Sequence, residues 1–119
     1  MSKKVLIVDD SAFMRKILRE IVAKFKVEII EATNSIELIN QYKAKRPDLV
    51  FLDIIMPGTG GDVALGELKK MDPNAKVIIV TAVGHRTMIK KCEKIGILGY
   101  ITKPFKEKEI AERIKAALG

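Results

Sequence analysis

Short apolar runs that alternate with amphipathic stretches constrain the fold of this chain more than any other feature. The runs at 49–52 and 77–80 are continuously apolar, which is typical of strands that are buried on both faces of a parallel sheet. The stretches between the runs repeat apolar residues at helical spacing. Five such strand–helix units predict an α/β fold, in which helices cover both faces of a doubly wound parallel sheet of five strands.

The same patterns place the individual elements. The expected strands cover residues 4–8, 27–32, 49 to 53 or 54, 77–80 and 98–101. The expected helices cover residues 11–25, 34 to before 47, 61–71, 85–95 and 106–118. In the second helix, Asn34 is the expected N-cap, with Glu37 as its capping-box partner. Apolar helix residues expected to face the core include Phe13, Ile36 and Val63.

Composition excludes several classes of protein. A chain of 119 residues, 48% of them hydrophobic, fits one domain spanning residues 1–119, with a real core. No apolar run approaches the roughly 18 residues of a membrane span, and the apolar stretch at 5–8 is too short for a signal peptide. The single cysteine, Cys92, excludes an internal disulfide. We expect a cytoplasmic protein, with no membrane partner.

The net charge of +7 raises the question of nucleic acid. The lysines are spread over every segment, as on an ordinary solvated surface. The aromatic residues are four Phe and two Tyr, with no Trp, so a base-stacking platform is not expected. We therefore expect no nucleic-acid partner. Binding to an acidic protein partner is the alternative explanation of the basic charge.

Chemically active side chains stand at the end of several of the expected strands or directly after them. They are Asp9, Asp10, Asp53, Thr81 and Lys103. Parallel strands bring such positions together at the carboxyl edge of a sheet. Two carboxylates about 4 Å apart repel by roughly 4 kcal/mol at an effective dielectric near 20, so the cluster needs protons or a cation. An all-oxygen donor set beside a lysine predicts a site for Mg²⁺ and a phosphoryl group.

A glycine-rich loop follows Asp53. Gly58, Gly60 and Gly61 match neither nucleotide-binding glycine pattern. We interpret these glycines as residues that turn the chain sharply and leave the carboxylate of Asp53 accessible.

These motifs resemble a known family along the whole chain. Asp9-Asp10 after the first strand, Asp53 followed by Met56-Pro57 and by Gly61, Thr81-Ala82 and Lys103-Pro104-Phe105 are together similar to a response-regulator receiver domain. The resemblance implies a flavodoxin-like fold with sheet order 2-1-3-4-5 and a cis Lys103-Pro104 bond.

The resemblance also implies roles for matching residues. Asp53 is the expected phosphoacceptor for a phosphohistidine of a partner kinase. Asp10, Asp53 and the backbone carbonyl of Ile55 are expected to bind Mg²⁺, and Asp9 to assist largely through water. Thr81 and Lys103 are expected to hold the phosphoryl group. Tyr100 is expected to swing inward as Thr81 moves. The protein is then a phosphoacceptor and not an enzyme acting on other substrates.

The stretch at 8–18 resembles chemotaxis regulators more than transcriptional ones. We expect a stand-alone, monomeric receiver with no output domain, which signals by docking to an acidic target such as a motor switch or an adaptor. The expected docking face comprises the fourth helix, the fifth strand and the fifth helix. Its expected partner-contacting residues are Arg86, Lys90, Lys91, Lys94 and Tyr100.

Three alternatives stay open at this point. An aspartyl-phosphate phosphatase would need a second acid two residues after Asp53, where Ile55 stands. A phosphorelay intermediate would pass the phosphoryl group on to another histidine. A constitutive docking module would never be phosphorylated, although the full acidic set and the lysine are present.

Ile55 and Val83 are apolar where flagellar-switch regulators usually have polar residues, and we expect them to slow self-dephosphorylation.

Overall fold

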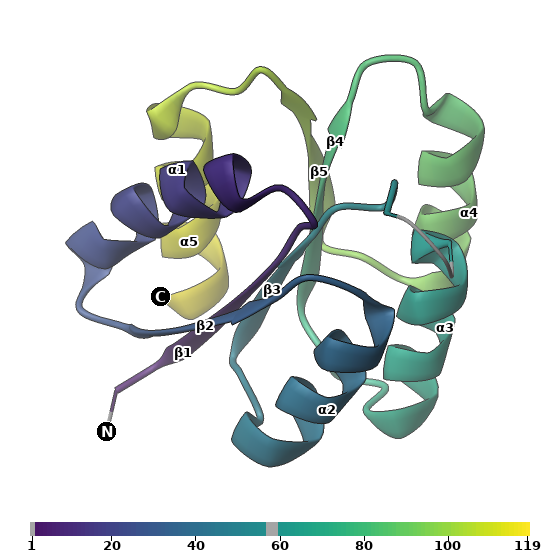
Figure 1. Ribbon diagram of the computed structural model, residues 1–119, viewed down its shortest axis with the longest axis horizontal. Helices are drawn as coiled ribbons and strands as arrows, with labels where there is room; N and C mark the ends of the chain where they lie inside the picture. The colour runs from purple at the N-terminus through teal and green to yellow at the C-terminus, as the bar shows by residue number, and fades with distance from the viewer. Residues whose placement is uncertain (1, 57–59) are drawn as a thin grey trace.

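A computed structural model describes residues 2–56 and 60–119. Its five parallel strands form one sheet in the order β2-β1-β3-β4-β5 (Figure 1). The strands are β1 (Lys4–Val8), β2 (Glu28–Ala32), β3 (Leu49–Leu52), β4 (Val77–Ala82) and β5 (Gly99–Lys103). The predicted fold class and strand order are confirmed.

Helices form a layer on each side of this sheet. They are α1 (Ala12–Val22), α2 (Ser35–Lys45), α3 (Gly61–Met71), α4 (Arg86–Ile95) and α5 (Glu107–Leu118), with a short 3₁₀ turn η1 (Ala23–Phe25) after α1. Figure 1 shows α1 and α5 on one face and α2, α3 and α4 on the other. Within the described parts of the chain, no helix has the length and apolar character needed to cross a bilayer.

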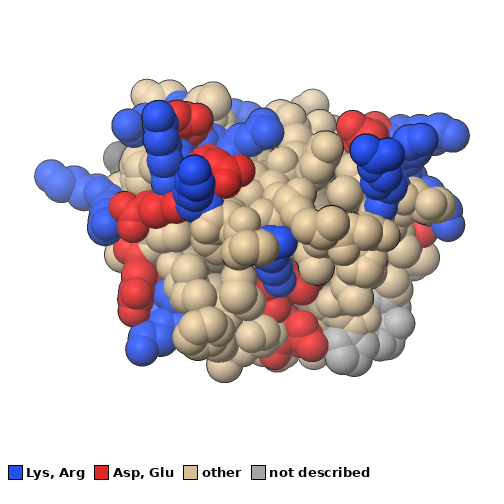
Figure 2. All heavy atoms as spheres, turned by 90° about the horizontal axis from the view of Figure 1, so that it is seen from above, with Lys and Arg blue, Asp and Glu red and all other residues tan. Residues whose placement is uncertain are grey.

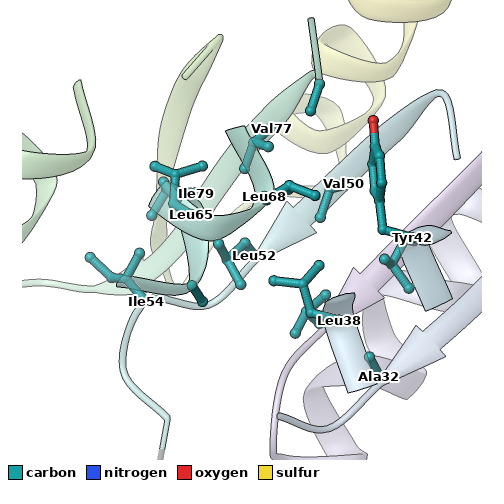
Figure 3. Close-up of a cluster of buried hydrophobic side chains, with 14 of the residues drawn as sticks. Ala32, Leu38, Tyr42, Val50, Leu52, Ile54, Leu65, Leu68, Val77 and Ile79 are labelled. Carbon is teal, nitrogen blue, oxygen red and sulfur yellow. The ribbon is translucent and has the colours of Figure 1, made fainter. Parts of the chain in front are cut away.

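The two layers create two cores that share the sheet. All four residues of β3 are buried because alternate side chains enter opposite cores. Val50 and Leu52 lie in the core beneath α2 and α3, where Figure 3 shows Leu52 near Leu38 and Leu65, and Val50 near Leu68. The intervening Phe51 packs in the core beneath α1 and α5. This double burial explains why the strand sequence is continuously apolar.

Three predicted core residues face solvent instead. Phe13, Ile36 and Val63 are 70%, 72% and 51% exposed. Ile36 and Val63 each precede a buried leucine, Leu38 and Leu65, by two residues. Two residues rotate a helix by about 200°, so each points away from the core. Phe13 precedes the first buried residue of α1 by more than one turn, and lines a surface hollow together with Pro104 and Phe105.

The predicted cap of α2 is confirmed in part. The side chain of Asn34 accepts a hydrogen bond from the amide of Glu37 at 2.8 Å. The carboxylate of Glu37 accepts hydrogen bonds from the amide and hydroxyl of Thr33, at 2.6 and 2.7 Å. The reciprocal contact of the capping box is therefore made one residue earlier than predicted.

Gly61 begins α3 and packs against the strand-end backbone. Its amide donates to the carbonyl of Ile54 at 3.1 Å, and a Cβ atom at Gly61 would overlap the backbone of Ile54. Gly66, in the same helix, has open space where a Cβ would lie. The predicted turn at 57–59 lies outside the described residues.

This contrast predicts opposite effects for two similar substitutions. Gly61→Ala is expected to lower the free energy of unfolding by about 1–3 kcal/mol, because overpacking forces the backbone apart. Gly66→Ala is expected to raise it by about 0.5–1 kcal/mol through helix propensity. Urea unfolding followed by circular dichroism measures both. A Gly61→Ala protein as stable as the native one would show that this close approach is not needed.

Candidate functional site

The carboxyl ends of the strands position the candidate site. Val8 and Leu52 are paired in the β1–β3 register, so the next residues, Asp9 and Asp53, leave neighbouring strands side by side. The amide of Asp53 donates to the carbonyl of Val8 at 2.9 Å, and the amide of Asp9 donates to the carbonyl of Ala32 at 3.1 Å. The hydrogen bonding of the sheet thus continues through both acids and fixes the positions of their backbones.

Three carboxylates meet at this edge. Asp9, Asp10 and Asp53 each offer an oxygen, and these oxygens lie within 4.8 Å of one another. Asp9 and Asp53 are 1% and 6% exposed, whereas Asp10 is exposed. Figure 2, which looks down on this end of the sheet, shows acidic side chains near its centre, with a basic side chain beside them and largely uncharged residues around. The predicted convergence of the three acids is confirmed.

Lys103 lies between the two buried carboxylates. Its ammonium nitrogen is 2.9 Å from Oδ2 of Asp9 and 3.2 Å from Oδ2 of Asp53. β4 extends through Ala82 and β5 through Lys103, two residues further than predicted, and Ala82 pairs with Lys103 in the register. The lysine is therefore the last residue of a strand, and its place in the sheet directs its side chain towards the acids.

Each buried carboxylate divides its oxygens in the same way. Oδ1 of Asp9 accepts from the amide of Ser11 at 2.9 Å, and Oδ1 of Asp53 accepts from the amide of Ile55 at 3.0 Å. Oδ2 of each acid faces Lys103. Such bonds to the backbone two residues on are typical of aspartates at turns. They fix both side chains before any ligand binds.

The site shifts the pKa of two of its groups. Burial raises the pKa of Asp53, although the amide of Ile55 and the charge of Lys103 act against this. Burial disfavours the charged form of Lys103, but its hydrogen bond to Asp9 and the charges of Asp53 and Asp9 outweigh burial and raise its pKa. The lysine thus stays a cation, because two acids compensate for its desolvation.

Thr81 adds a buried hydroxyl at this edge. The residue is fully buried, and its Oγ1 has no hydrogen-bond partner among the residues that the structure describes. Buried hydroxyls nearly always have a partner, so a ligand oxygen would complete this site. The orphaned hydroxyl, the oxygen-only carboxylate cluster and the lysine together fit Mg²⁺ and a phosphoryl group.

The predicted partner-contacting residues are all exposed. Arg86, Lys90, Lys91 and Lys94 of α4 are exposed, and Tyr100 of β5 is 44% exposed. Arg86, Lys90 and Tyr100 also line a hollow of about 310 Å³, together with Ile89 and Glu93.

The two apolar residues expected to slow self-dephosphorylation, Ile55 and Val83, are 45% and 76% exposed. The Lys103-Pro104 bond is cis, as predicted.

Sequence reasoning missed a second layer of residues behind the acids. Arg15 of α1 donates to the backbone carbonyl of Asp9 at 2.8 Å and to Glu31 of β2 at 3.1 Å. Arg19 donates to the other carboxylate oxygen of Glu31 at 2.8 Å. The sequence offered two signals for this layer. One was a pair of arginines four residues apart, which lie on one helix face, and the other was an acid within a strand.

Comparison with known proteins identifies the family. Residues 5–115 match the response regulator receiver domain family. Chemotaxis protein CheY of Thermotoga maritima is 44% identical over 115 residues, covering 96% of this chain and 96% of that protein. Chemotaxis protein CheY of Halobacterium salinarum is 43% identical over 118 residues, covering 99% and 98%.

A solved structure agrees with these relatives. The crystal structure of the CheX–CheY–BeF₃–Mg²⁺ complex from Borrelia burgdorferi contains a chain with a TM-score of 0.90 and 33% identity, covering 98% of this chain and 90% of that one. The chain described here therefore belongs to the response regulator receiver domain family, a class of signalling protein. Within that family it is similar to chemotaxis CheY proteins.

The bridging position of Lys103 predicts a large effect on stability. Lys103→Met is expected to lower the free energy of unfolding in metal-free buffer by about 3–5 kcal/mol, because it leaves two buried carboxylates without their cation. Lys108→Met is the control. That lysine is 85% exposed, with Glu112 3.9 Å away, and an exposed pair contributes about 0–1 kcal/mol. Equal losses in the two variants would contradict a bridging role.

Proposed function

We propose that this protein is a response regulator in which Asp53 accepts a phosphoryl group from a phosphohistidine of a partner histidine kinase. The observation that carries the proposal is the site's combination of buried groups: Asp53, a cation 3.2 Å from its Oδ2, and the orphaned hydroxyl of Thr81. In the transfer, a carboxylate oxygen of Asp53 forms a bond to phosphorus. The bond from phosphorus to the imidazole nitrogen breaks, and its electron pair leaves with the imidazole.

The acidic residues would hold Mg²⁺ during this transfer. Asp10, Asp53 and the backbone carbonyl of Ile55 would be direct ligands, and Asp9 would act largely through water. This division is the one that the receiver-domain family implies, and the contact with Lys103 is common to Oδ2 of Asp9 and Oδ2 of Asp53. When bound, the metal ion offsets negative charge on the phosphoryl oxygens.

Phosphorylation would then switch the domain. Converting the carboxylate of Asp53 to an acyl phosphate adds about one negative charge and new acceptor oxygens. Lys103 would pair with the phosphoryl group and Thr81 would donate its hydroxyl to it, while Tyr100 would move inward. A change from mostly inactive to mostly active needs about 5.5 kcal/mol of differential stabilisation. Contacts absent before phosphorylation can contribute to that difference.

The output surface would be the face formed by α4, β5 and α5. The exposed cations Arg86, Lys90, Lys91 and Lys94 favour an acidic target, such as a motor-switch or adaptor protein in chemotaxis signalling. Similarity to chemotaxis CheY proteins supports this role. We propose that the protein signals as a monomeric receiver domain, by docking through this face.

Intact mass measurement tests the proposal. The protein is incubated with a small phosphodonor and Mg²⁺, and we expect one phosphoryl group to be added. Asp53→Asn is expected to abolish this gain, while Asp48→Asn, an acid remote from the cluster, retains it. No gain in the native protein, or a gain that survives Asp53→Asn, would contradict the proposal.

The same preparation separates the alternatives. Steady hydrolysis of many phosphomonoesters would indicate a phosphatase, although Ile55 occupies the position where such an enzyme would have its second acid. Rapid loss of the phosphoryl group to a histidine-containing phosphotransfer protein would indicate a relay intermediate. A protein that binds its target equally well with and without phosphodonor would be a constitutive docking module.

Exposed apolar side chains near the acceptor predict a long-lived acyl phosphate. Ile55 follows Asp53 by two residues, and Val83 follows Thr81 by two; both are exposed, and can keep water from the acyl phosphate. Ile55→Asn and Val83→Glu are each expected to speed dephosphorylation several-fold, measured as the decay of the phosphorylated mass. The outward-facing Ile36→Asn is the control. Unchanged decay in both test variants would rule out shielding.

A further inference from the structure

Arg15 connects three parts of the fold directly behind the acidic cluster. From α1, it donates through Nη1 to the carbonyl oxygen of Asp9 at 2.8 Å, and through Nε to Glu31 of β2 at 3.1 Å. Its side chain is only 16% exposed, compared with 43% for Arg19. A guanidinium group that is mostly buried and donates in two directions has little freedom to move.

Arg15 contacts the backbone of Asp9 and not its side chain, so it acts on the path of the chain. The carbonyl of Asp9 belongs to the peptide group that joins Asp9 to Asp10. That group is planar, so the position of its oxygen fixes the orientation of the plane up to the Cα atom of Asp10. Arg15 therefore restrains where the chain places Asp10, whose exposed carboxylate completes the acidic cluster.

Glu31 in turn restrains Arg15. Its two carboxylate oxygens accept from Arg15 and from Arg19, and its neighbour Ala32 accepts the amide of Asp9 through its carbonyl. The end of β2 and the face of α1 thus hold the Asp9–Asp10 turn from two sides.

We propose that Arg15 is a positioning residue for the metal site: through the Asp9 carbonyl it holds the Asp10 carboxylate where Mg²⁺ binds, and so sets the affinity for the ion. This inference rests on the metal-binding part of the proposed function. Arg15 itself touches neither the ion nor the phosphoryl group in this account.

Charge and positioning predict opposite outcomes when Arg15 is replaced by an uncharged residue. As a cation near the carboxylates, Arg15 repels Mg²⁺, so removing its charge alone would tighten Mg²⁺ binding. As a support for the turn, its removal would loosen the site and weaken binding. Residues that support metal ligands from behind typically contribute about 10–100-fold to metal affinity. The repulsion between Arg15 and Mg²⁺ is screened by solvent and salt, so we expect the loss of support to have the larger effect.

The test is a titration of the folded protein with MgCl₂, followed through backbone amide shifts in NMR spectra. Arg15→Met is expected to weaken Mg²⁺ binding about 10-fold. Arg15→Lys, which keeps the charge but cannot donate as a fork, is expected to show an intermediate loss. Arg19→Met is the matched control, because Arg19 binds Glu31 but not Asp9, and it is expected to bind Mg²⁺ within about 2-fold of the native protein.

The outcomes separate the possible roles. Tighter binding or unchanged binding in Arg15→Met would overturn the inference, because a merely structural residue would change unfolding stability without weakening the metal affinity of the folded protein. Equal weakening in Arg15→Met and Arg19→Met would also overturn it. Native protein that shows no saturable Mg²⁺ response would instead refute the metal site itself, and the inference with it. Arg15→Lys keeps the test valid if Arg15→Met does not fold.

Discussion

Lys103 holds two buried carboxylates from neighbouring strands, and the arrangement of the site depends on that ion pair. Its ammonium group lies 2.9 Å from Asp9 and 3.2 Å from Asp53, while both acids are almost inaccessible to water. Without a cation, two carboxylates so close would repel each other strongly in a medium of low polarity. The lysine permits an accumulation of acids that can still bind a divalent ion. Because it is the last residue of β5, the sheet itself determines its position.

The sheet also connects the site to the surface where we propose that signals leave. Thr81 is buried inside β4, whereas Ala82, Val83 and Gly84 directly after it are exposed and lead into α4. A displacement of Thr81 towards a phosphoryl group would therefore reach α4 through a short segment of chain. We expect the cores on the two faces of the sheet to remain intact in such a change, because close-packed interiors transmit movement more readily than they deform.

Much of this could be predicted from sequence because the strongest patterns are local or topological. Continuous apolar strands indicated burial on both faces, and parallel strands brought Asp9, Asp53 and Lys103 to one edge. Exposure of Ile36 was mispredicted, because an apolar residue alone does not say which side of a helix faces the core. Arg15 escaped prediction because its contact is to a backbone carbonyl, and only the packing of α1 against β2 brings the two together.

The central claim is that Asp53, Lys103 and Thr81 form one phosphoryl-binding site. A crystal structure of this protein with beryllofluoride and Mg²⁺ tests it most directly, because every contact can be seen. The account predicts the beryllofluoride group on a carboxylate oxygen of Asp53, with Nζ of Lys103 and Oγ1 of Thr81 both within hydrogen-bond distance of its fluorine atoms. Beryllofluoride bound to another residue, or a Thr81 hydroxyl that still has no partner beside an occupied Asp53, would contradict it.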